Sequence, residues 1–147
     1  MRISEAMTRD VHMVQPNQSL IEAARMMADC DCGALPVSDN DRLVGMITDR
    51  DIVVRGLAQG KDGNTQVREV MSSEVMYCFE EDDLAEVARN MGDIQKRRLP
   101  VVNRDKRLVG IISLGDIATT DEMPAADALA GISEPSAQHH SSGQRPH

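Results

Sequence analysis

Two stretches of the chain place apolar residues at the spacing of an amphipathic helix. In each, apolar side chains recur at positions i, i+3, i+4 and i+7, which puts them on one face of a helix. The members are Leu20, Ala23, Ala24 and Met27 in one stretch, and Leu84, Val87, Ala88 and Met91 in the other. Ser19 and Asp83 precede them, each followed three residues later by Glu, which is a helix-start signal. The pattern predicts two helices that bury one face.

Short apolar runs before and after these helices predict strands. A polar turn at residues 38–41 splits the runs Ala34–Val37 and Leu43–Ile47, which indicates a β-hairpin with a longer loop. The second stretch repeats this pattern, and we expect extended segments ahead of both helices. These remaining segments are Leu99–Val102, a turn at Asn103–Lys106, Leu108–Ile112, and the extended stretches Val11–Val14 and Val75–Phe79. A second helix is expected to begin at Thr48 in the first stretch and at Ser113 in the second, so each unit reads β-α-β-β-α.

The two units form an internal repeat. The segment Ile3–Ile52 overlays Val67–Ile117 with a shift of 64 residues that becomes 65 after one insertion in the hairpin turn. We therefore predict an α/β (α+β) fold in which two repeats, residues 1–60 and 61–120, pack with pseudo-two-fold symmetry, because one unit alone buries little surface. Residues 121–147, rich in Ser, Gln, His and Pro towards the end, are expected to form a flexible tail.

Composition narrows the possible functions. The chain of 147 residues carries a formal net charge of -8, which argues against general nucleic-acid binding. With one Tyr, one Phe and no Trp, a bound ring must be held mainly by aliphatic side chains and backbone. No apolar run approaches the roughly 20 residues of a membrane span, and the first residues lack the apolar core of a signal peptide. We expect a cytoplasmic protein that does not bind membranes.

The cysteines and histidines offer little for catalysis or metal binding. Cys30, Cys32 and Cys78 are odd in number and follow no secretion signal, so the sequence predicts no disulfide framework. The C-x-C pair lacks a partner Cys or His pair, and we interpret it as two small side chains near a helix end. His12 is the single histidine inside the repeats, so we expect no catalytic residues and no metal site.

The strongest local motif lies where the second strand of each hairpin meets a helix. Thr48 precedes Asp51 by three positions, and Ser113 precedes Asp116 by three. Both pairs fit a helix cap, in which the hydroxyl and the carboxylate each bind a free backbone N–H. They also fit a nucleotide site, in which the Asp accepts from ribose hydroxyls and Arg50 pairs with phosphate. From these residues alone both interpretations stay open.

The doubled unit resembles the cystathionine-β-synthase (CBS) domain pair, also called a Bateman module. The resemblance rests on L-P-V at 35–37 and 99–101, L-V-G at 43–45 and 108–110, and I-[TS]-x-x-D-I at 47–52 and 112–117, and it covers about residues 3–118. It is greatest to small stand-alone bacterial two-CBS proteins, some of them linked to stress or low oxygen.

That resemblance implies a non-catalytic regulatory module without an obligatory cofactor. Family members bind AMP, ADP, ATP, NAD(H) or S-adenosylmethionine in clefts between the repeats, with the motif Asp on ribose and the base against strand residues, and they commonly form homodimers. Carried onto this chain, the resemblance implies Thr48 and Asp51 in one site and Ser113 and Asp116 in the other. The other expected ligand-binding residues are Arg50, Ala34, Ile47 and Ile112. The second motif has Leu114-Gly115 where the first has Asp49-Arg50, so the two sites are expected to differ.

Lys96, Arg97 and Arg98 form the densest basic cluster in this acidic chain. We interpret them either as a solvated loop or as a phosphate clamp, in which Arg97 and Arg98 bind the ligand. Two further functions remain open: a structural or stress-response CBS protein without ligand, and a thiol redox or metal sensor at Cys30 and Cys32. The sequence does not identify the ligand or the protein partner.

Overall fold

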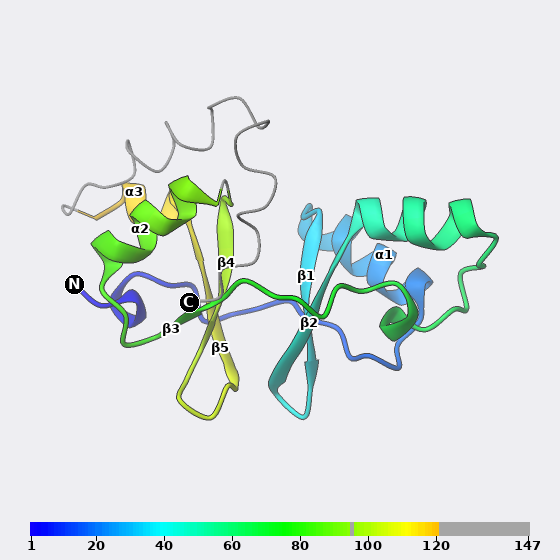
Figure 1. Ribbon diagram of the computed structural model, residues 1–147, viewed down its shortest axis with the longest axis horizontal. Helices are drawn as coiled ribbons and strands as arrows, with labels where there is room; N and C mark the ends of the chain where they lie inside the picture. Colours follow the sequence, from blue (N-terminus) through cyan, green and yellow to red (C-terminus); the bar gives the residue numbers. More distant parts are fainter. Residues whose placement is uncertain (95, 121–147) are drawn as a thin grey trace. The chain divides into compact units, whose positions relative to one another are not determined.

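The structure, a computed structural model, describes residues 1–94 and 96–120. Helices and strands alternate along the chain in two similar sets (Figure 1). In chain order the elements are η1 (Ile3–Glu5), α1 (Leu20–Cys30), β1 (Ala34–Asp39), β2 (Arg42–Thr48), η2 (Asp51–Gly56), η3 (Leu57–Gln59), η4 (Val67–Glu69), β3 (Cys78–Phe79), α2 (Leu84–Asp93), β4 (Arg98–Val102), β5 (Leu108–Ser113) and α3 (Leu114–Ala118). The predicted mixed helix-and-strand fold is confirmed, and the tail expected at 121–147 lies outside the described residues.

The two predicted amphipathic helices are present and begin where their caps indicate. The hydroxyl of Ser19 accepts from the N–H of Glu22 at the start of α1, and the carboxylate of Asp83 accepts from the N–H of Glu86 at the start of α2. All four apolar positions of α2 are fully buried. In α1 the buried residues are Leu20, Ala23 and Met27, and the prediction fails at Ala24, which is exposed.

Both hairpins are antiparallel, but their turns differ in length. In the first hairpin Asp39 pairs with Arg42, so the turn consists of Asn40 and Asp41 alone. Both have positive φ, 50° and 70°, a conformation that Asn and Asp tolerate better than most residues and that suits a tight hairpin turn. The predicted longer loop over 38–41 is therefore wrong. In the second hairpin Val102 pairs with Leu108, and the predicted longer turn is confirmed.

The extended segments ahead of the helices pair less than predicted. β3 runs parallel to β4 over two residues, and in the first repeat only Val14 forms a parallel bridge, to Val37. The ladder stops after Val14 because the N–H of Gln15 turns to the side-chain oxygen of Gln18, 2.8 Å away, and Pro16 has no N–H to offer. The strand expected over Val11–Val14 is reduced to the one bridge at Val14.

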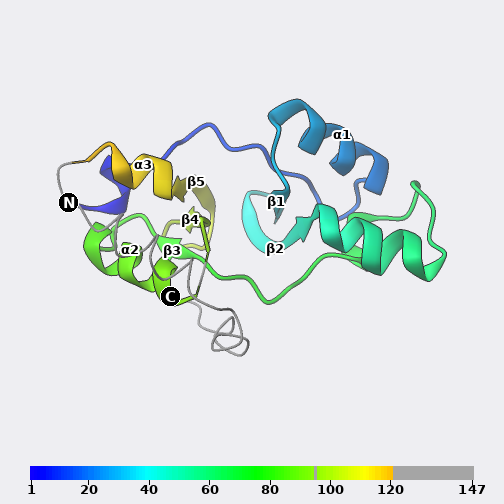
Figure 2. The same ribbon diagram turned by 90° about the horizontal axis from the view of Figure 1, so that it is seen from above.

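Two compact units make up the described chain, and each is completed by a segment from the other repeat. Of the described residues, one unit contains 1–11, 76–94 and 96–120, and the other contains His12–Val75. Ile3 lies in the core of the second repeat together with Leu84, and Figure 2 shows this N-terminal segment beside α2 and α3. Val67 and Val70, which open the second repeat in sequence, lie in the core of the first. No helix among the described residues is long and apolar enough to cross a membrane.

Backbone hydrogen bonds fix each exchanged segment against the second strand of a hairpin. Thr8 exchanges two 2.9 Å backbone hydrogen bonds with Ile111, and Ser72 exchanges two with Met46. Gly110 and Gly45 lie next to these contacts. A Cβ at Gly110 would lie 2.8 Å from the carbonyl oxygen of Thr8. The strand needs glycine here because a backbone oxygen occupies the space that a side chain would fill.

We expect Gly110→Ala to lower the free energy of unfolding by about 1–3 kcal/mol, because the new methyl group forces the Thr8 segment off the strand. Gly115→Ala is the matched control, since the nearest atom to its Cβ is the Ser113 hydroxyl at 3.6 Å. Within helix α3 the control should be neutral or stabilising by up to ~1 kcal/mol. Denaturant unfolding of both variants checks this, and equal stability of the two would contradict the close approach.

Candidate functional site

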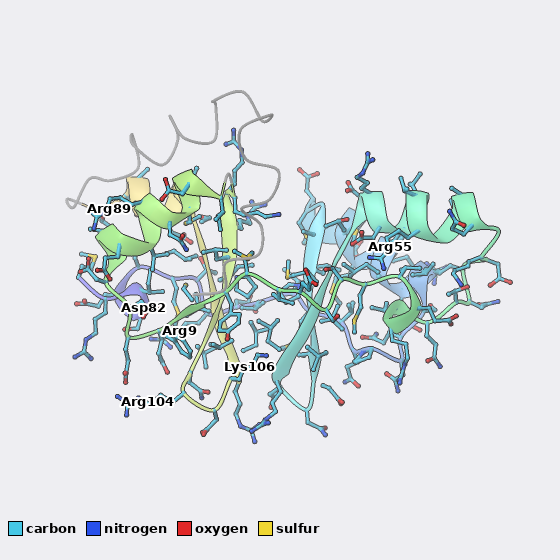
Figure 3. All side chains as sticks on the ribbon, in the orientation of Figure 1. Arg9, Arg55, Asp82, Arg89, Arg104 and Lys106 are labelled. Carbon is cyan, nitrogen blue, oxygen red and sulfur yellow. A yellow bond between two sulfur atoms is a disulfide. The ribbon has the colours of Figure 1, made fainter. Side chains whose placement is uncertain are left out.

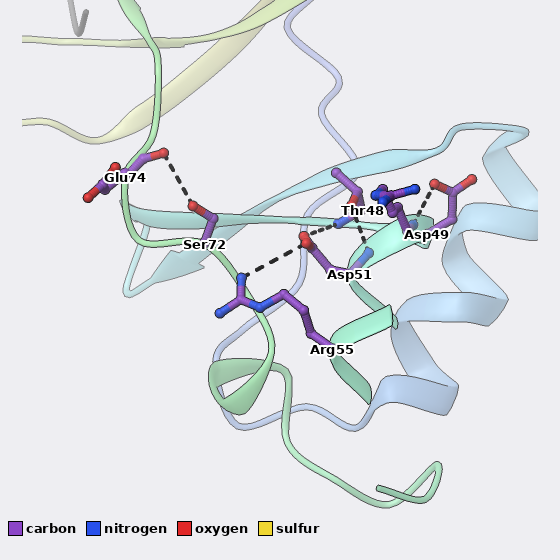
Figure 4. Close-up of polar contacts among 7 residues, drawn as sticks. Thr48, Asp49, Asp51, Arg55, Ser72 and Glu74 are labelled. Atoms are coloured by element: carbon purple, nitrogen blue, oxygen red, sulfur yellow. Dashed lines mark hydrogen bonds and ion pairs between the residues drawn. The ribbon is translucent and has the colours of Figure 1, made fainter. Parts of the chain in front are cut away.

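The candidate site is a strand-to-helix turn that occurs once in each unit. In the first, the N–H of Thr48 donates to Asp51 Oδ2 at 2.9 Å, and the N–H of Asp51 donates to Thr48 Oγ1 at 3.0 Å (Figure 4). In the second, Ser113 and Asp116 make the same two bonds at 3.0 and 3.1 Å. The capping geometry predicted from sequence is therefore present at both motifs.

The cap engages one carboxylate oxygen firmly and leaves the other for weaker contacts. Asp51 Oδ1 lies 3.9 Å from a guanidinium nitrogen of Arg55, and Figure 4 shows that arginine one helical turn along. Asp116 Oδ1 accepts from the hydroxyl of Thr8 at 3.3 Å. The Asp51 side chain is 18% exposed to solvent. Each Asp is thus oriented by its own backbone turn while an oxygen stays able to accept from a ligand hydroxyl.

A residue from one exchanged segment reaches a motif turn, which the sequence analysis did not predict. Thr8 contacts Asp116 directly, and its counterpart Ser72 is fixed to Met46 by the backbone pairing described above. The hydroxyl of Ser72 donates to the carbonyl oxygen of Glu74 at 3.4 Å. The matching M-T and M-S dipeptides at 7–8 and 71–72 were a sequence signal for this role, because equivalent positions of a repeat occupy equivalent places.

Ile47 and Ile112, predicted to lie against a base, are both fully buried in the hydrophobic cores. Their side chains are therefore inaccessible as the units stand. Strand residues two apart share a face, so Met46 lies on the face of Thr48, and Ile111 lies on the face of Ser113. Both Met46 and Ile111 are half-buried. Met46 and Ile111 thus share a strand face with the motif hydroxyls, whereas Ile47 and Ile112 face the cores.

The remaining predicted residues surround the turns. Ala34 pairs with Thr48 across the first hairpin, and Arg98 pairs with Ser113 across the second; both are exposed. Arg97 is exposed one residue earlier, and its carbonyl accepts from the N–H of Leu114 at 3.0 Å. Arg50 is exposed, and its N–H donates to Asp49 Oδ1.

The cysteines differ from the prediction. Cys30 and Cys32 form a disulfide across Asp31. Asp31 ends α1 with φ 53° and ψ 46°, and this left-handed turn brings the two Cα atoms to 5.4 Å, within the usual range for a disulfide. Cys78 is a buried free thiol, and burial, reinforced by the nearby Asp82 carboxylate, raises the pKa of that thiol, which keeps it protonated and unreactive. No group of three or more His, Cys, Asp or Glu residues in the described chain could hold a metal ion.

Two basic side chains outside the motif turns, Arg104 and Lys106, contact residues of their own surroundings. Figure 3 labels Arg104 and Lys106 at the turn between β4 and β5. Arg104 pairs with Glu81 at 2.9 Å, and Lys106 lies 5.5 Å from the centre of the Tyr77 ring. The contacts of Arg104 and Lys106 stabilise the turn between β4 and β5, and they do not involve the Thr48–Asp51 or Ser113–Asp116 motif.

The family model for the CBS domain matches residues 3–56 and 67–129. The chain belongs to the CBS-domain family. Hypoxic response protein 1 of Mycobacterium tuberculosis is 41% identical over 116 residues, which are 78% of this chain and 80% of that protein. The crystal structure of Hypoxic Response Protein I with two coordinated zinc ions matches with a TM-score of 0.71 at 40% identity, covering 80% of this chain and 97% of that one.

Two further CBS-pair structures carry adenosine ligands. CBSX2 of Arabidopsis thaliana in complex with AMP matches with a TM-score of 0.69 at 27% identity. The CBS domain pair of MJ0100 in complex with 5-methylthioadenosine and S-adenosyl-L-methionine matches with a TM-score of 0.67 at 28% identity. Each match covers 80% of this chain and 93% of the other. CBS pairs are in general regulatory modules, and the comparisons indicate no catalytic family.

Ser113→Ala and Thr48→Ala should each lower the free energy of unfolding by about 1 kcal/mol, because each removes a side-chain cap of a helix start. Ser73→Ala is the matched control, since Ser73 is exposed and caps no helix in the part of the chain that the structure describes. Urea unfolding measures all three. A loss in the control as large as in the cap variants would show that the caps do not act as described.

Proposed function

We propose that the chain is a regulatory CBS pair that binds an adenine-containing ligand at the two motif turns. The observation that carries this proposal is the duplicated aspartate, Asp51 and Asp116, oriented by its own turn and left with an oxygen that can accept from ribose hydroxyls. Related CBS pairs that hold AMP, 5-methylthioadenosine or S-adenosyl-L-methionine support the ligand class. No residue is proposed to be catalytic, and no cofactor is proposed as obligatory.

The surroundings of each turn suit such a ligand. A ribose held by Asp116 would lie beside the hydroxyls of Thr8 and Ser113, and the aliphatic face of Ile111 would offer contact to the base in a chain with almost no aromatic side chains. Met46 would do the same beside Thr48 and Asp51. Binding would signal to a partner protein by favouring one arrangement of the chain over another.

The second helical segment of the first repeat supports a homodimer. Val53, Val54 and Leu57 are 56%, 40% and 60% exposed on the consecutive segments η2 and η3, an unusual concentration of apolar surface. We propose that a second copy of the chain covers these residues. A cytoplasmic location remains an expectation from the sequence.

Adenine ligands should raise the melting temperature of the chain. A ligand present at 100 times its dissociation constant adds about 2.7 kcal/mol of stability, which shifts the midpoint by several degrees. The panel is AMP, ADP, ATP, NAD⁺, NADH and S-adenosylmethionine. The double variant Asp51→Asn/Asp116→Asn should lose the shift, while Asp39→Asn, at an exposed strand end, should keep it. If no compound shifts the wild type, the motifs act only as caps, and the chain is a structural CBS protein.

A second candidate function, a thiol redox sensor, is favoured by the Cys30–Cys32 disulfide. A small-molecule disulfide would oxidise the two thiols by exchange and release two thiols of its own. After denaturation without reductant, a maleimide should label one thiol, Cys78, and after reduction it should label three. Cys32→Ser is the control and should label two in both conditions. Three labelled thiols in the unreduced wild type would remove this candidate.

A further inference from the structure

Each motif turn makes the same backbone hydrogen bond to the start of its hairpin, but the charged residue at that bond is acidic in the first repeat and basic in the second. In the first repeat the N–H of Asp49 donates to the carbonyl of Gly33 at 2.9 Å, and in the second the N–H of Leu114 donates to the carbonyl of Arg97 at 3.0 Å. Both bonds join the residue after the motif hydroxyl to the residue just before the first strand of the hairpin. The same place in the fold therefore holds a glycine with an aspartate in one repeat and an arginine with a leucine in the other.

At the first turn the aspartate occupies the space that a side chain on the strand would need. Asp49 Oδ2 lies 3.1 Å from the position that a Cβ on Gly33 would take. The neighbours of Gly33, Cys32 and Ala34, carry no charge. The first turn thus presents the carboxylates of Asp49 and Asp51 against the single flanking cation of Arg50, with Arg55 already near Asp51.

At the second turn three consecutive cationic residues begin the hairpin whose second strand leads to a single motif carboxylate, Asp116. Lys96, Arg97 and Arg98 are consecutive and exposed, while Gly115 and Leu114 replace the charged pair of the first turn. Within residues 1–94 and 96–120, none of the three takes part in an ion pair. Counting the residues of each turn and of its hairpin start, the first repeat has a formal charge of -1 and the second has +2.

We propose, as a refinement that rests on the proposed adenine-ligand function, that the two turns take different ligand classes. The Asp116 turn takes a nucleotide with two or more phosphates, and the Asp51 turn takes an adenosine derivative without phosphate, with a neutral or cationic group on its 5′ carbon. Arg97 and Asp49 are the specificity-determining residues. A guanidinium binds phosphate oxygens in a bidentate way, whereas a carboxylate at the same place repels phosphate and attracts a sulfonium or ammonium group.

Calorimetric titration of single-site variants tests this assignment. Asp51→Asn leaves the second turn competent, and Asp116→Asn leaves the first; asparagine keeps an oxygen that can cap the helix. Each variant is titrated with adenosine, AMP, ADP, ATP and S-adenosylmethionine, with a chelator present so that no divalent cation neutralises the phosphates. Affinity should rise from adenosine to ATP in Asp51→Asn. It should fall along the same series in Asp116→Asn, where S-adenosylmethionine should bind best.

Substitutions at Arg97 and Asp49 should each change the ranking of ligand affinities at one turn only. Added to Asp51→Asn, Arg97→Ala should weaken ATP binding at least about tenfold and leave adenosine binding unchanged, because it removes a charge-assisted hydrogen bond to phosphate. Arg104→Ala, which removes an arginine paired with Glu81 elsewhere, is the control. Added to Asp116→Asn, Asp49→Asn should raise AMP affinity, since it keeps the oxygen that accepts from the N–H of Arg50 and loses only the charge. Asp39→Asn is its control.

The outcomes separate this inference from the function on which it rests. The same phosphate dependence at both turns, or an ATP affinity unaffected by Arg97→Ala in a variant that melts like its parent, would overturn the ligand split and leave adenine binding intact. If no adenosine compound binds the wild type, the proposed function fails, and the ligand split fails with it. An affinity that rises from adenosine to ATP at the Asp116 turn and falls along that series at the Asp51 turn would establish that the two turns take different ligands.

Discussion

Each repeat depends on a backbone contact made by a segment from the other repeat. Thr8 is hydrogen-bonded to Ile111 on one hairpin, and Ser72 is hydrogen-bonded to Met46 on the other, at positions where a glycine leaves room for a carbonyl oxygen. These contacts place Ile3 in one core and Val67 in the other. They also bring the Thr8 hydroxyl to Asp116 at the second motif turn, and they pair Ser72 with Met46, two residues before Thr48 at the first.

The helix caps and the candidate sites use the same atoms, so stability and binding are coupled. Asp51 and Asp116 are oriented because they cap a helix, and an oriented carboxylate loses little freedom when a ribose binds. A cap alone would explain the motif hydroxyls. It does not explain why a basic cluster lies at the start of one hairpin while Gly33 and Asp49 occupy the same place in the other.

Local signals in the sequence predicted most of the helices and strands, but they did not predict the contacts between distant segments. Ser19 and Asp83 marked the helix starts, and the two motif turns follow from strand pattern and capping. The exchange of opening segments was not predicted, because Ile3 and Val67 carry no local sign of the strand they will meet. Ile47 was assigned to a ligand surface although strand alternation places it in the core. The Cys30–Cys32 disulfide depends on one left-handed residue, which the sequence does not specify.

The central claim is that the motif aspartates hold the ribose of an adenine ligand, and a crystal structure of the chain grown with ADP tests it most directly. The account predicts that the ribose hydroxyls are hydrogen-bonded to the Asp116 carboxylate, with Thr8 and Ser113 beside them. Ligand density that contacts neither Asp116 nor Asp51 would contradict the account and would leave the two motifs as helix caps alone.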